Sequence, residues 1–468
     1  MLIILQYSMR SCLFFVLLLT ALVMADSFLV LSGDGSDDEG CGTFDFPCRS
    51  MKQVLLEHSN KKEENTPLIV KILPGVYSSE KDININLPNV PLTIEGLSNE
   101  VTFDCENRPS SFAFTATSQV EMSQIIINNC VTAIKFLPEQ KQTLILEEVQ
   151  ISQCDTAVHA TNGGVVIANS SFGNLNSALE FIDTDVQIES SLIDNTSTGI
   201  QCTISNENQS TLKVEHTVFQ QTTTPIQSDS ANDIQSLQLT LSDSEFSKCE
   251  HIDISVNTNG MIRDVSFLNS ATRVLSINAP GVWTFDNIQV QNSGGIEFLH
   301  EEITAEFIQS SFSSNTASNG AAIYFAGSQL TLTDSSFEEN HAVKYGAGIF
   351  MESGVCVMDG VQFTENKAKK GSAIFCEHDS FVESNKNDFT LQNNANMKGD
   401  DVACPMVSSS DTTSDGPSPL APLWICLELV GTVFPLFVML SIVAIILRKQ
   451  LCKPVQTLNG YNSELQML

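Results

Sequence analysis

The chain has 468 residues, of which 55 are acidic and 23 basic, and its formal net charge is −32. Binding to nucleic acid requires Lys and Arg side chains that neutralise phosphates, so this balance excludes a nucleic-acid partner and disfavours other polyanions such as heparin-like glycans. A surface charged to this extent stays soluble and favours cationic partners or divalent ions.

An apolar run from Leu13 to Val23 follows Arg10, and the sequence Val-Met-Ala that ends at Ala25 suits cleavage. We therefore expect residues 1–25 to be a secretory signal peptide. The alternative is a retained N-terminal membrane anchor. The run is too short for that role, since a span needs about 20 apolar residues.

Residues 26–90 are predicted to form an N-terminal cap and the first coils of a larger domain, because an open β-ladder needs cover at its end. Within them, residues 50–59 have the pattern of a short amphipathic helix. An acidic loop precedes this helix and is a candidate Ca²⁺ site, because Ca²⁺ prefers oxygen ligands. Its acidic residues are Asp34, Asp37, Asp38 and Glu39. A solvated loop without metal is the alternative, and no other cofactor is expected.

Two apolar columns with one drifting period run through the rest of the domain. The first returns every 21 to 28 residues and comprises Ile134, Val158, Leu179, Ile200, Ile226, Ile252, Val274, Ile296, Ile323, Ile349, Ile374 and Val402. The second precedes it by 6 to 13 residues and comprises Ile127, Ile151, Phe172, Leu192, Phe219, Phe246, Phe267, Val290, Phe312, Phe337, Phe363 and Phe389. Such a period indicates a solenoid, in which each repeat forms one coil and buries its apolar face against its neighbours.

A coil of about 24 residues has room for three short strands and their turns. Residues 323–337 show the alternation of apolar and polar side chains that is typical of strands. Helical solenoids have longer periods, and leucine-rich repeats show Leu at fixed spacings that are absent here. We therefore expect residues 91–404 to form an all-β solenoid of stacked parallel strands with an aliphatic interior.

The last four coils have a longer turn between the two columns than the first eight. In three of them an Asn follows the aromatic residue at a fixed place, at Asn315, Asn340 and Asn366. Stacked Asn amides can hydrogen-bond along a solenoid axis and close such a turn, and a ligand site built from them is the alternative. Glycines that suit tight corners precede the aliphatic column in the same coils, at Gly320, Gly346 and Gly371.

Ten cysteines lie between residues 41 and 404, an even number that predicts disulfides in a secreted domain. Equivalent positions of neighbouring coils lie about 4.8 Å apart, a Cα separation that a disulfide accepts. The pairings that register and spacing favour are Cys376–Cys404, Cys130–Cys154 and the short loop Cys41–Cys48. Cys202 and Cys249 lie two coils apart and are expected to be buried thiols, and no cysteine is expected to be catalytic.

Beyond the solenoid, residues 405–422 are rich in Ser, Thr, Asp and Pro and are predicted to be a stalk. Residues 423–447 are mostly apolar and long enough to cross a bilayer, and basic residues open the predicted cytoplasmic tail, 448–468. We expect a type I single-pass protein of the plasma membrane or another secretory-pathway membrane, with the solenoid outside. Its candidate glycosylation sites are Asn169, Asn195 and Asn208.

Several stretches resemble known β-helical proteins. Ile-Leu-Pro-Gly-Val-Tyr at 72–77, followed by Leu-Thr-Ile-Glu-Gly at 92–96, resembles the opening of pectin-lyase-like right-handed parallel β-helices. The Phe-x-x-Asn turns, with Gly-Ala-Ala-Ile at 320–323 and Gly-Ser-Ala-Ile at 371–374, resemble the repeats of polymorphic outer-membrane proteins. The resemblance implies a right-handed β-helix over roughly residues 30–404 and a place at the cell surface. The bacterial members are adhesins with a different membrane domain, so adhesion carries over only by analogy.

Three functions remain open from the sequence. The first is a non-enzymatic cell-surface protein whose β-helical ectodomain serves adhesion or binds a protein or glycan ligand. The second is a membrane-anchored polysaccharide lyase or hydrolase, which needs clustered acids on one face. The acid pairs available for it are Asp183 with Asp185 and Asp400 with Asp401. Neither pair carries the Gly-His-Gly or Arg-x-Lys signature of polygalacturonase-like enzymes, so we expect no catalytic residue. The third is an inert structural coat.

Overall fold

The computed structural model describes residues 28–60, 66–205, 209–230, 236–378, 380–383, 389–392 and 401–407. These residues belong to one compact unit, Met1–Ser409. The predicted signal peptide, transmembrane helix and cytoplasmic tail and most of the predicted stalk lie outside the described residues, as do Asn208 and Asp400. No helix within the described ranges is long and apolar enough to cross a membrane.

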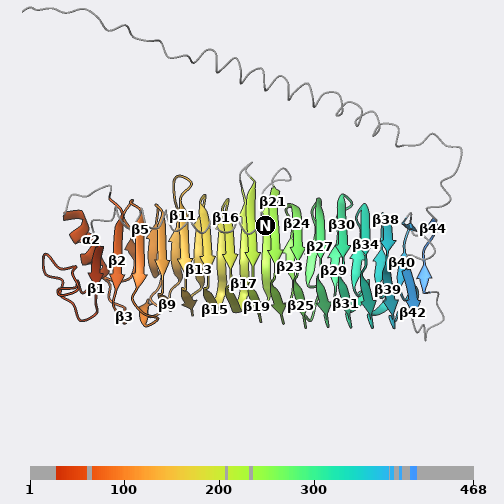
Figure 1. The fold of residues 1–468 in the computed structure, drawn as a ribbon, viewed down its shortest axis with the longest axis horizontal. Helices are drawn as coiled ribbons and strands as arrows, with labels where there is room; N and C mark the ends of the chain where they lie inside the picture. The colour runs from red at the N-terminus through yellow and green to blue at the C-terminus, as the bar shows by residue number, and fades with distance from the viewer. Residues whose placement is uncertain are drawn as a thin grey trace, which may run out of the picture. The chain divides into compact units, whose positions relative to one another are not determined.

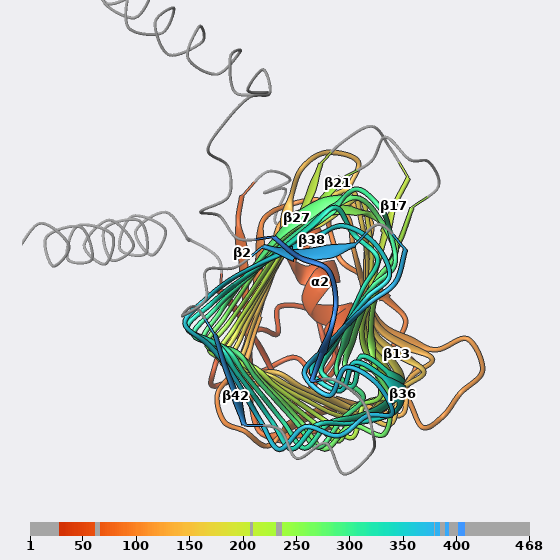
Figure 2. The same ribbon diagram turned by 90° about the vertical axis from the view of Figure 1, so that its right-hand side faces the viewer.

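The unit is a solenoid of parallel strands, seen from the side in Figure 1 and along its axis in Figure 2. One face is a 16-stranded sheet, called sheet A here. The strands of the other two faces form one 26-stranded sheet, sheet B, because two long strands, β15 and β17, take part in both faces. The predicted parallel β-helix is therefore confirmed.

Sheet A joins one strand from each coil in chain order. Its strands are β1 (Phe28–Leu31), β2 (Leu68–Ile72), β5 (Leu92–Gly96), β8 (Val120–Ser123), β11 (Thr143–Glu147), β14 (Gly164–Ala168), β16 (Asp185–Glu189), β18 (Ser210–Glu215), β21 (Ser236–Ser242), β24 (Asn257–Arg263), β27 (Gly281–Asp286), β30 (Ile303–Ile308), β34 (Gln329–Thr333), β38 (Val355–Asp359), β41 (Phe381–Glu383) and β44 (Met406–Val407).

Sheet B contains two parallel ladders. The first comprises β3 (Gly75–Tyr77), β6 (Val101–Asp104), β9 (Ile126–Asn128), β12 (Gln150–Ser152), β15 (Ser171–Ile182), β17 (Leu192–Ile204), β19 (Val218–Gln220), β22 (Glu245–Ser247), β25 (Ser266–Leu268), β28 (Gln289–Gln291), β31 (Ser311–Ser313), β35 (Ser336–Glu338), β39 (Val361–Thr364) and β42 (Phe389–Gln392). The second shares β15 and β17 and adds β4 (Ile85–Asn86), β7 (Phe112–Ala116), β10 (Thr132–Phe136), β13 (Thr156–Thr161), β20 (Thr224–Ser230), β23 (Ile252–Ile254), β26 (Leu275–Ile277), β29 (Ile296–Phe298), β33 (Ile323–Phe325), β37 (Ile349–Met351), β40 (Ile374–Cys376) and β43 (Val402–Ala403).

The two predicted apolar columns are the strand registers of sheet B, with three corrections. In one coil Leu275, and not Val274, pairs with Ile252 and Ile296. In another, Ile193 holds the place predicted for Leu192, whose side chain is 39% exposed. Near the end of the solenoid, Leu391 pairs with Phe363 in place of Phe389. Because side chains alternate between the faces of a strand, the shift of one residue places the side chain of Leu192 on the outer face, whereas Val274 is still buried beside its column.

The predicted helix is α2 (Met51–Asn60), which covers the first coil and buries Met51 and Val54 in the apolar core. Ser50 caps it, because its hydroxyl accepts a hydrogen bond from the amide of Gln53 at 3.4 Å. The sheet A ladder already begins at β1, on the N-terminal side of the helix.

A single buried column of turn residues, called the turn ladder here, follows the first ladder of sheet B. Each member comes directly after a residue with positive φ, which turns the chain between two strands. The members are Cys130, Cys154, Leu175, Thr196, Thr222, Cys249, Ser270, Ser293, Asn315, Asn340 and Asn366. None of them is more than 7% exposed. The ladder is thus a second buried seam beside the apolar core.

The three asparagines of the turn ladder form the predicted hydrogen-bonded stack. The amide of Asn340 donates to Oδ1 of Asn366 at 2.9 Å and to the carbonyl of Phe312 at 3.0 Å. Its own Oδ1 accepts from the side-chain amide of Asn315 at 2.9 Å and from the backbone amide of the same residue at 3.1 Å. The side-chain amide of Asn340 therefore hydrogen-bonds to a backbone carbonyl of one neighbouring coil and to the Asn side chain of the next.

The structure contains the disulfides Cys41–Cys48 and Cys376–Cys404, in agreement with the register argument. The predicted pairing of Cys130 with Cys154 is wrong: Cys130 pairs with Cys105, and Cys154 is a free, buried thiol. The register argument missed Cys105 because the turn between Cys105 and Phe114 is longer than the turn between Cys130 and Ile134, the residue that pairs with Phe114. Cys202, Cys249 and Cys356 are also free and buried.

Candidate functional site

The outer face of sheet A carries the side chains that alternate with those of the core. In register, Thr143 lies beside Gly164, which lies beside Asp185. The same row continues through Thr211 and Gln238. These residues lie in successive coils, so side chains far apart in the sequence form a continuous polar row along the solenoid.

A hollow of about 510 Å³ opens on this face, over β11, β14, β16, β18 and β21. We call it the sheet A groove. It is lined by Lys141, Gln142, Thr143, Gly163, Gly164, Val165, Val166, Asp185, Val186, Gln187, Thr211, Leu212, Lys213, Gln238 and Thr240. Amides, hydroxyls and two ammonium groups surround a small apolar floor, so the groove offers both donors and acceptors of hydrogen bonds.

Gly164 gives the groove much of its depth. A Cβ added there would meet Oγ1 of Thr143 at 3.4 Å, and the carbonyl oxygen of Gln142 and Cγ2 of Thr143 at 3.8 Å, which are ordinary contacts. The neighbouring Gly163 differs, because its Cβ would lie 2.6 Å from the ring of Phe136. Close packing against Phe136 therefore requires glycine at position 163, whereas Gly164 leaves open space on the outer face.

Asp185 is the one carboxylate among the described residues that line the groove, and its partners hold it in place. The ammonium group of Lys141 is 3.1 Å from Oδ2. The amide and the hydroxyl of Thr211 both donate to Oδ1 at 3.1 Å. On the far side of the groove, Lys213 forms a 2.7 Å ion pair with Glu215.

Asp183 and Asp185, the first predicted acid pair, each hydrogen-bond to a residue of the next coil. Asp183 lies in the turn before β16 and accepts hydrogen bonds from the amide and hydroxyl of Ser205 in the next coil, the former at 2.8 Å. Buried Thr184 separates it from Asp185. Both acids therefore link successive coils. In the second pair, the backbone carbonyl of Asp401 accepts hydrogen bonds from Ala373 and Ile374, and Asp400 is outside the described residues.

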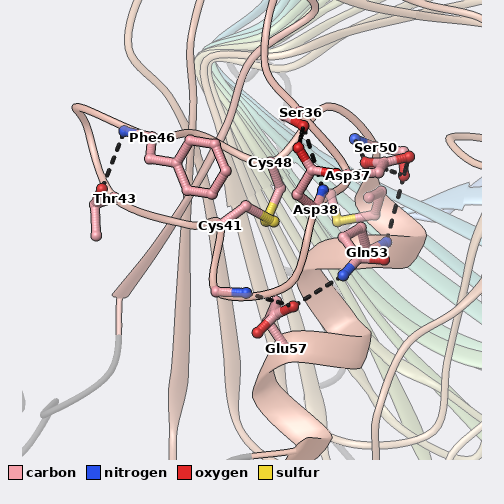
Figure 3. The surroundings of a disulfide bond; sticks show 12 residues. Ser36, Asp37, Asp38, Cys41, Thr43, Phe46, Cys48, Ser50, Gln53 and Glu57 are labelled. Atoms are coloured by element: carbon pink, nitrogen blue, oxygen red, sulfur yellow. Dashed lines mark hydrogen bonds between the residues drawn. A yellow bond between two sulfur atoms is a disulfide. The ribbon is translucent and has the colours of Figure 1, made fainter.

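The acidic loop that was a candidate Ca²⁺ site is part of the cap, as Figure 3 shows. Asp37 accepts hydrogen bonds from the amide and hydroxyl of Ser50, both at 2.9 Å, and from Lys81 at 2.8 Å. Burial raises the pKa of Asp37, but the hydrogen bonds from Lys81 and Ser50 outweigh it, and the pKa lies below its usual value. The carboxylate stabilises the start of α2.

The other three acids of this loop are exposed and do not converge with Asp37. Asp38 contacts the hydroxyl of Ser36, whereas Asp34 and Glu39 point to no shared centre. In the part of the chain that the structure describes, no three His, Cys, Asp or Glu side chains are placed to hold a metal ion. In the described structure Asp37 therefore acts as a helix cap, and the Ca²⁺ site stays a prediction.

Three acids that the sequence did not single out gather on the outer face of sheet A, on β5, β8 and β11, the last of which also lies under the groove. Glu121 lies between the coils of Glu95 and Glu147. Burial, together with Glu147 and Glu95, raises the pKa of Glu121. Strand register could have found this stripe, since all three belong to neighbouring strands of one sheet.

Two of the candidate glycosylation sites, Asn169 and Asn195, are exposed at turns of the solenoid. The side-chain amide of Asn195 donates to Oδ1 of Asn174 at 2.7 Å. Exposure is compatible with modification at both positions.

The comparisons with known proteins are consistent with this architecture but do not assign a family. Residues 309–326, about one coil, match the model of the Chlamydia polymorphic membrane protein repeat. This match contains Asn315 and Gly320, two of the residues that carried the predicted resemblance. No curated protein sequence matches the chain significantly.

Among solved structures, the chain is similar to GH136 lacto-N-biosidase from Eubacterium ramulus, with 10% identity and a TM-score of 0.34 over 78% of this chain and 68% of that one. It is also similar to pectate lyase Pel9A, with 10% identity and a TM-score of 0.30 over 84% of each chain. These scores are low, so the assignment of the fold rests on the strand pairing of the chain itself.

Proposed function

We propose that the solenoid is the exterior, non-enzymatic part of a cell-surface protein and that it binds a neutral glycan in the sheet A groove. The observation that carries the proposal is the groove itself. It is a hollow of about 510 Å³ in which Gln, Thr and Lys side chains of β11, β16, β18, β21 and the turn before β11 surround the space left by Gly164. Sugar hydroxyls both donate and accept hydrogen bonds, and this lining can do both.

Binding is favoured over hydrolysis because of the carboxylates. Glycoside hydrolysis with two acids needs a pair of carboxyl groups across the scissile bond. Asp185 is the one carboxylate among the described residues of the lining, and Lys141 and Thr211 occupy its oxygens. In this position Asp185 orients the surrounding donors of the groove.

The test is a neutral-glycan array probed with the purified full-length chain, with and without Ca²⁺, followed by affinity measurement on any hit. The variant Gly164→Trp places a large side chain in the groove without backbone strain, because the position is open and extended. We expect at least about a tenfold loss of affinity, which corresponds to roughly 1.4 kcal/mol. Chelation of Ca²⁺ should change nothing, because Asp37 already has protein partners.

The matched control is Val282→Trp. Val282 lies in the same outward row of sheet A, in β27, and is 58% exposed. It adds the same side chain outside the groove and should leave binding unchanged. Equal losses in both variants, or no glycan hit at all, would contradict the proposal and favour the coat alternative. Release of shortened products from a hit would show an enzyme instead.

A further inference from the structure

The last coils carry a lateral ridge outside the two main sheets. It is built from β32 (Thr316–Asn319), β36 (His341–Tyr345) and residues 367–370. β36 pairs in parallel with β32 on one side. On the other side, bridges from His341 to Lys367 and from Tyr345 to Lys370 extend the pairing. We call this structure the lysine ridge, for the residues described next.

Four lysines lie on this ridge: Lys344, Lys367, Lys369 and Lys370. All four are exposed. The pairing brings them together, because the carbonyl of Lys344 accepts hydrogen bonds from the amides of Lys369 at 3.0 Å and Lys370 at 3.4 Å. Likewise, the amide of Ala342 donates to the carbonyl of Lys367 at 2.9 Å. Neighbouring strands lie about 4.8 Å apart, so the four lysines lie on one small surface.

None of the ion pairs in the described part of the chain involves these lysines. Like charges held side by side repel one another, so the cluster gains free energy when an anion joins it. The strongly negative net charge of the chain gives no sign of this local positive patch.

The ridge is also held rigidly from below. Its inward small side chains pack in an apolar cluster formed by Ala317, Ala321, Ala342, Ala347 and Ala368. At its base, the guanidinium of Arg273 donates hydrogen bonds to the carbonyls of Asn319 at 2.7 Å and Gly320 at 2.6 Å. A surface fixed in this way presents its charges without first paying the entropy of ordering a loop.

We propose that the lysine ridge binds a short sulfated oligosaccharide. A long polyanion fits poorly, because Glu338, Glu339 and Glu365 border the ridge and the rest of the chain is acidic. A protein partner also fits poorly, because protein interfaces are depleted in Lys and need a broad apolar centre. The ridge offers one exposed apolar side chain, Val343.

The test measures binding of a heparin-derived hexasaccharide to the full-length chain at low salt, with its desulfated counterpart as a second probe. The variant replaces all four lysines with Gln. The matched control, Arg49→Gln with Lys52→Gln, Lys135→Gln and Lys248→Gln, changes the net charge equally at scattered positions. We expect at least a tenfold loss for the ridge variant, less than a twofold loss for the control, and no binding of the desulfated probe. Thermal unfolding of both variants checks that they fold.

Several outcomes would overturn the proposal. Equal losses in the ridge and control variants would mean that only net charge matters. No binding of the hexasaccharide, or equal binding of its desulfated form, would remove the sulfate from recognition. Binding of phosphatidylserine vesicles or of a poly-glutamate peptide in place of the sugar would identify a lipid or protein partner instead. The Gly164→Trp variant should bind the hexasaccharide normally, which separates this site from the sheet A groove.

Discussion

From Cys130 to Ser293 the turn ladder is filled by thiols, hydroxyls and one leucine, whereas from Asn315 to Asn366 it is filled by amides. A hydroxyl such as that of Thr196 makes one contact along the axis, a 3.3 Å hydrogen bond to Thr222. An Asn makes several, because its side chain has two donors and an acceptor. The side chain at the same turn position can therefore form a single hydrogen bond along the axis, as a hydroxyl does, or take part in a cooperative hydrogen-bonded stack, as an Asn does. Only the stacked region also supports the lateral ridge.

The two regions differ in charge as well. The outer face of the early coils carries the stripe of Glu95, Glu121 and Glu147, while the last coils carry the lysine ridge. The solenoid repeats its backbone but not its surface, so neighbouring coils can carry opposite charges at little cost to the fold. Five substitutions would break or sharpen this comparison.

The largest effect is expected for Asn340→Ala, in the middle of the Asn stack. It leaves the amide of Asn315 and the carbonyl of Phe312 without their partners inside the protein. We expect the free energy of unfolding in denaturant to fall by about 2–4 kcal/mol. The control is Asn176→Ala, which removes an exposed hydrogen bond to Asp155. An equal, small effect at both sites would show that the stack adds nothing beyond ordinary turns.

The next effect concerns the thiol part of the ladder. Cys130→Ala removes the Cys105–Cys130 disulfide, and we expect a loss of about 2–3 kcal/mol. Cys105→Ala should cost less, because the Sγ of Cys154 already accepts a hydrogen bond from the amide of Cys130 at 3.3 Å and is the nearest replacement.

Disulfide mapping by mass spectrometry checks this second prediction. Burial raises the pKa of Cys154 to about 11, so in the unaltered protein its thiol should resist alkylation at neutral pH. The Cys105→Ala variant should contain a Cys130–Cys154 disulfide. Alkylation of both cysteines in that variant would show that the two positions are not interchangeable.

A smaller effect is expected for Gly346→Ala, at a corner found only in the last coils. Gly346 has φ +60°, and an added Cβ would lie 2.2 Å from the carbonyl oxygen of Ile349. We expect thermal unfolding to show a loss of about 1–3 kcal/mol. Gly164→Ala, at an open strand position, is the control and should be close to neutral. No difference between the two would mean that the corner relaxes freely.

The smallest effect is expected for Glu121→Gln in the acidic stripe. The folded pKa of Glu121 is raised, so the folded state binds the proton more tightly than the unfolded state. Its stability therefore falls as pH rises from the ordinary Glu range through the raised pKa. Glu121→Gln should remove this loss. Above the raised pKa of Glu121, the free energy of unfolding of the variant should therefore exceed that of the unaltered protein by about 0.2–1 kcal/mol. Unfolding measured from pH 4 to 8 checks the sign, with exposed Glu245→Gln as the control.

The sequence by itself determined the solenoid. Period, strand alternation and the Phe-x-x-Asn turns are local patterns, and each coil repeats the same backbone, so the apolar columns and the Asn stack follow from spacing alone. The errors at Val274 and Leu192 are shifts of one residue, because a column with a drifting period does not say which of two adjacent apolar side chains belongs to it. The error at Phe389 is a shift of two residues along the same strand.

Only the tertiary structure decided where the surface features lie. The partner of Cys130 depended on the length of one irregular turn, and Asp37 became a helix cap because the chain brings Ser50 and Lys81 to it. The sheet A groove and the lysine ridge each combine residues from several coils. The net charge is a sum over the whole chain and does not reveal such clusters. Spacing specifies which strands stack, but the identity of side chains that meet across coils emerges only once the register is fixed.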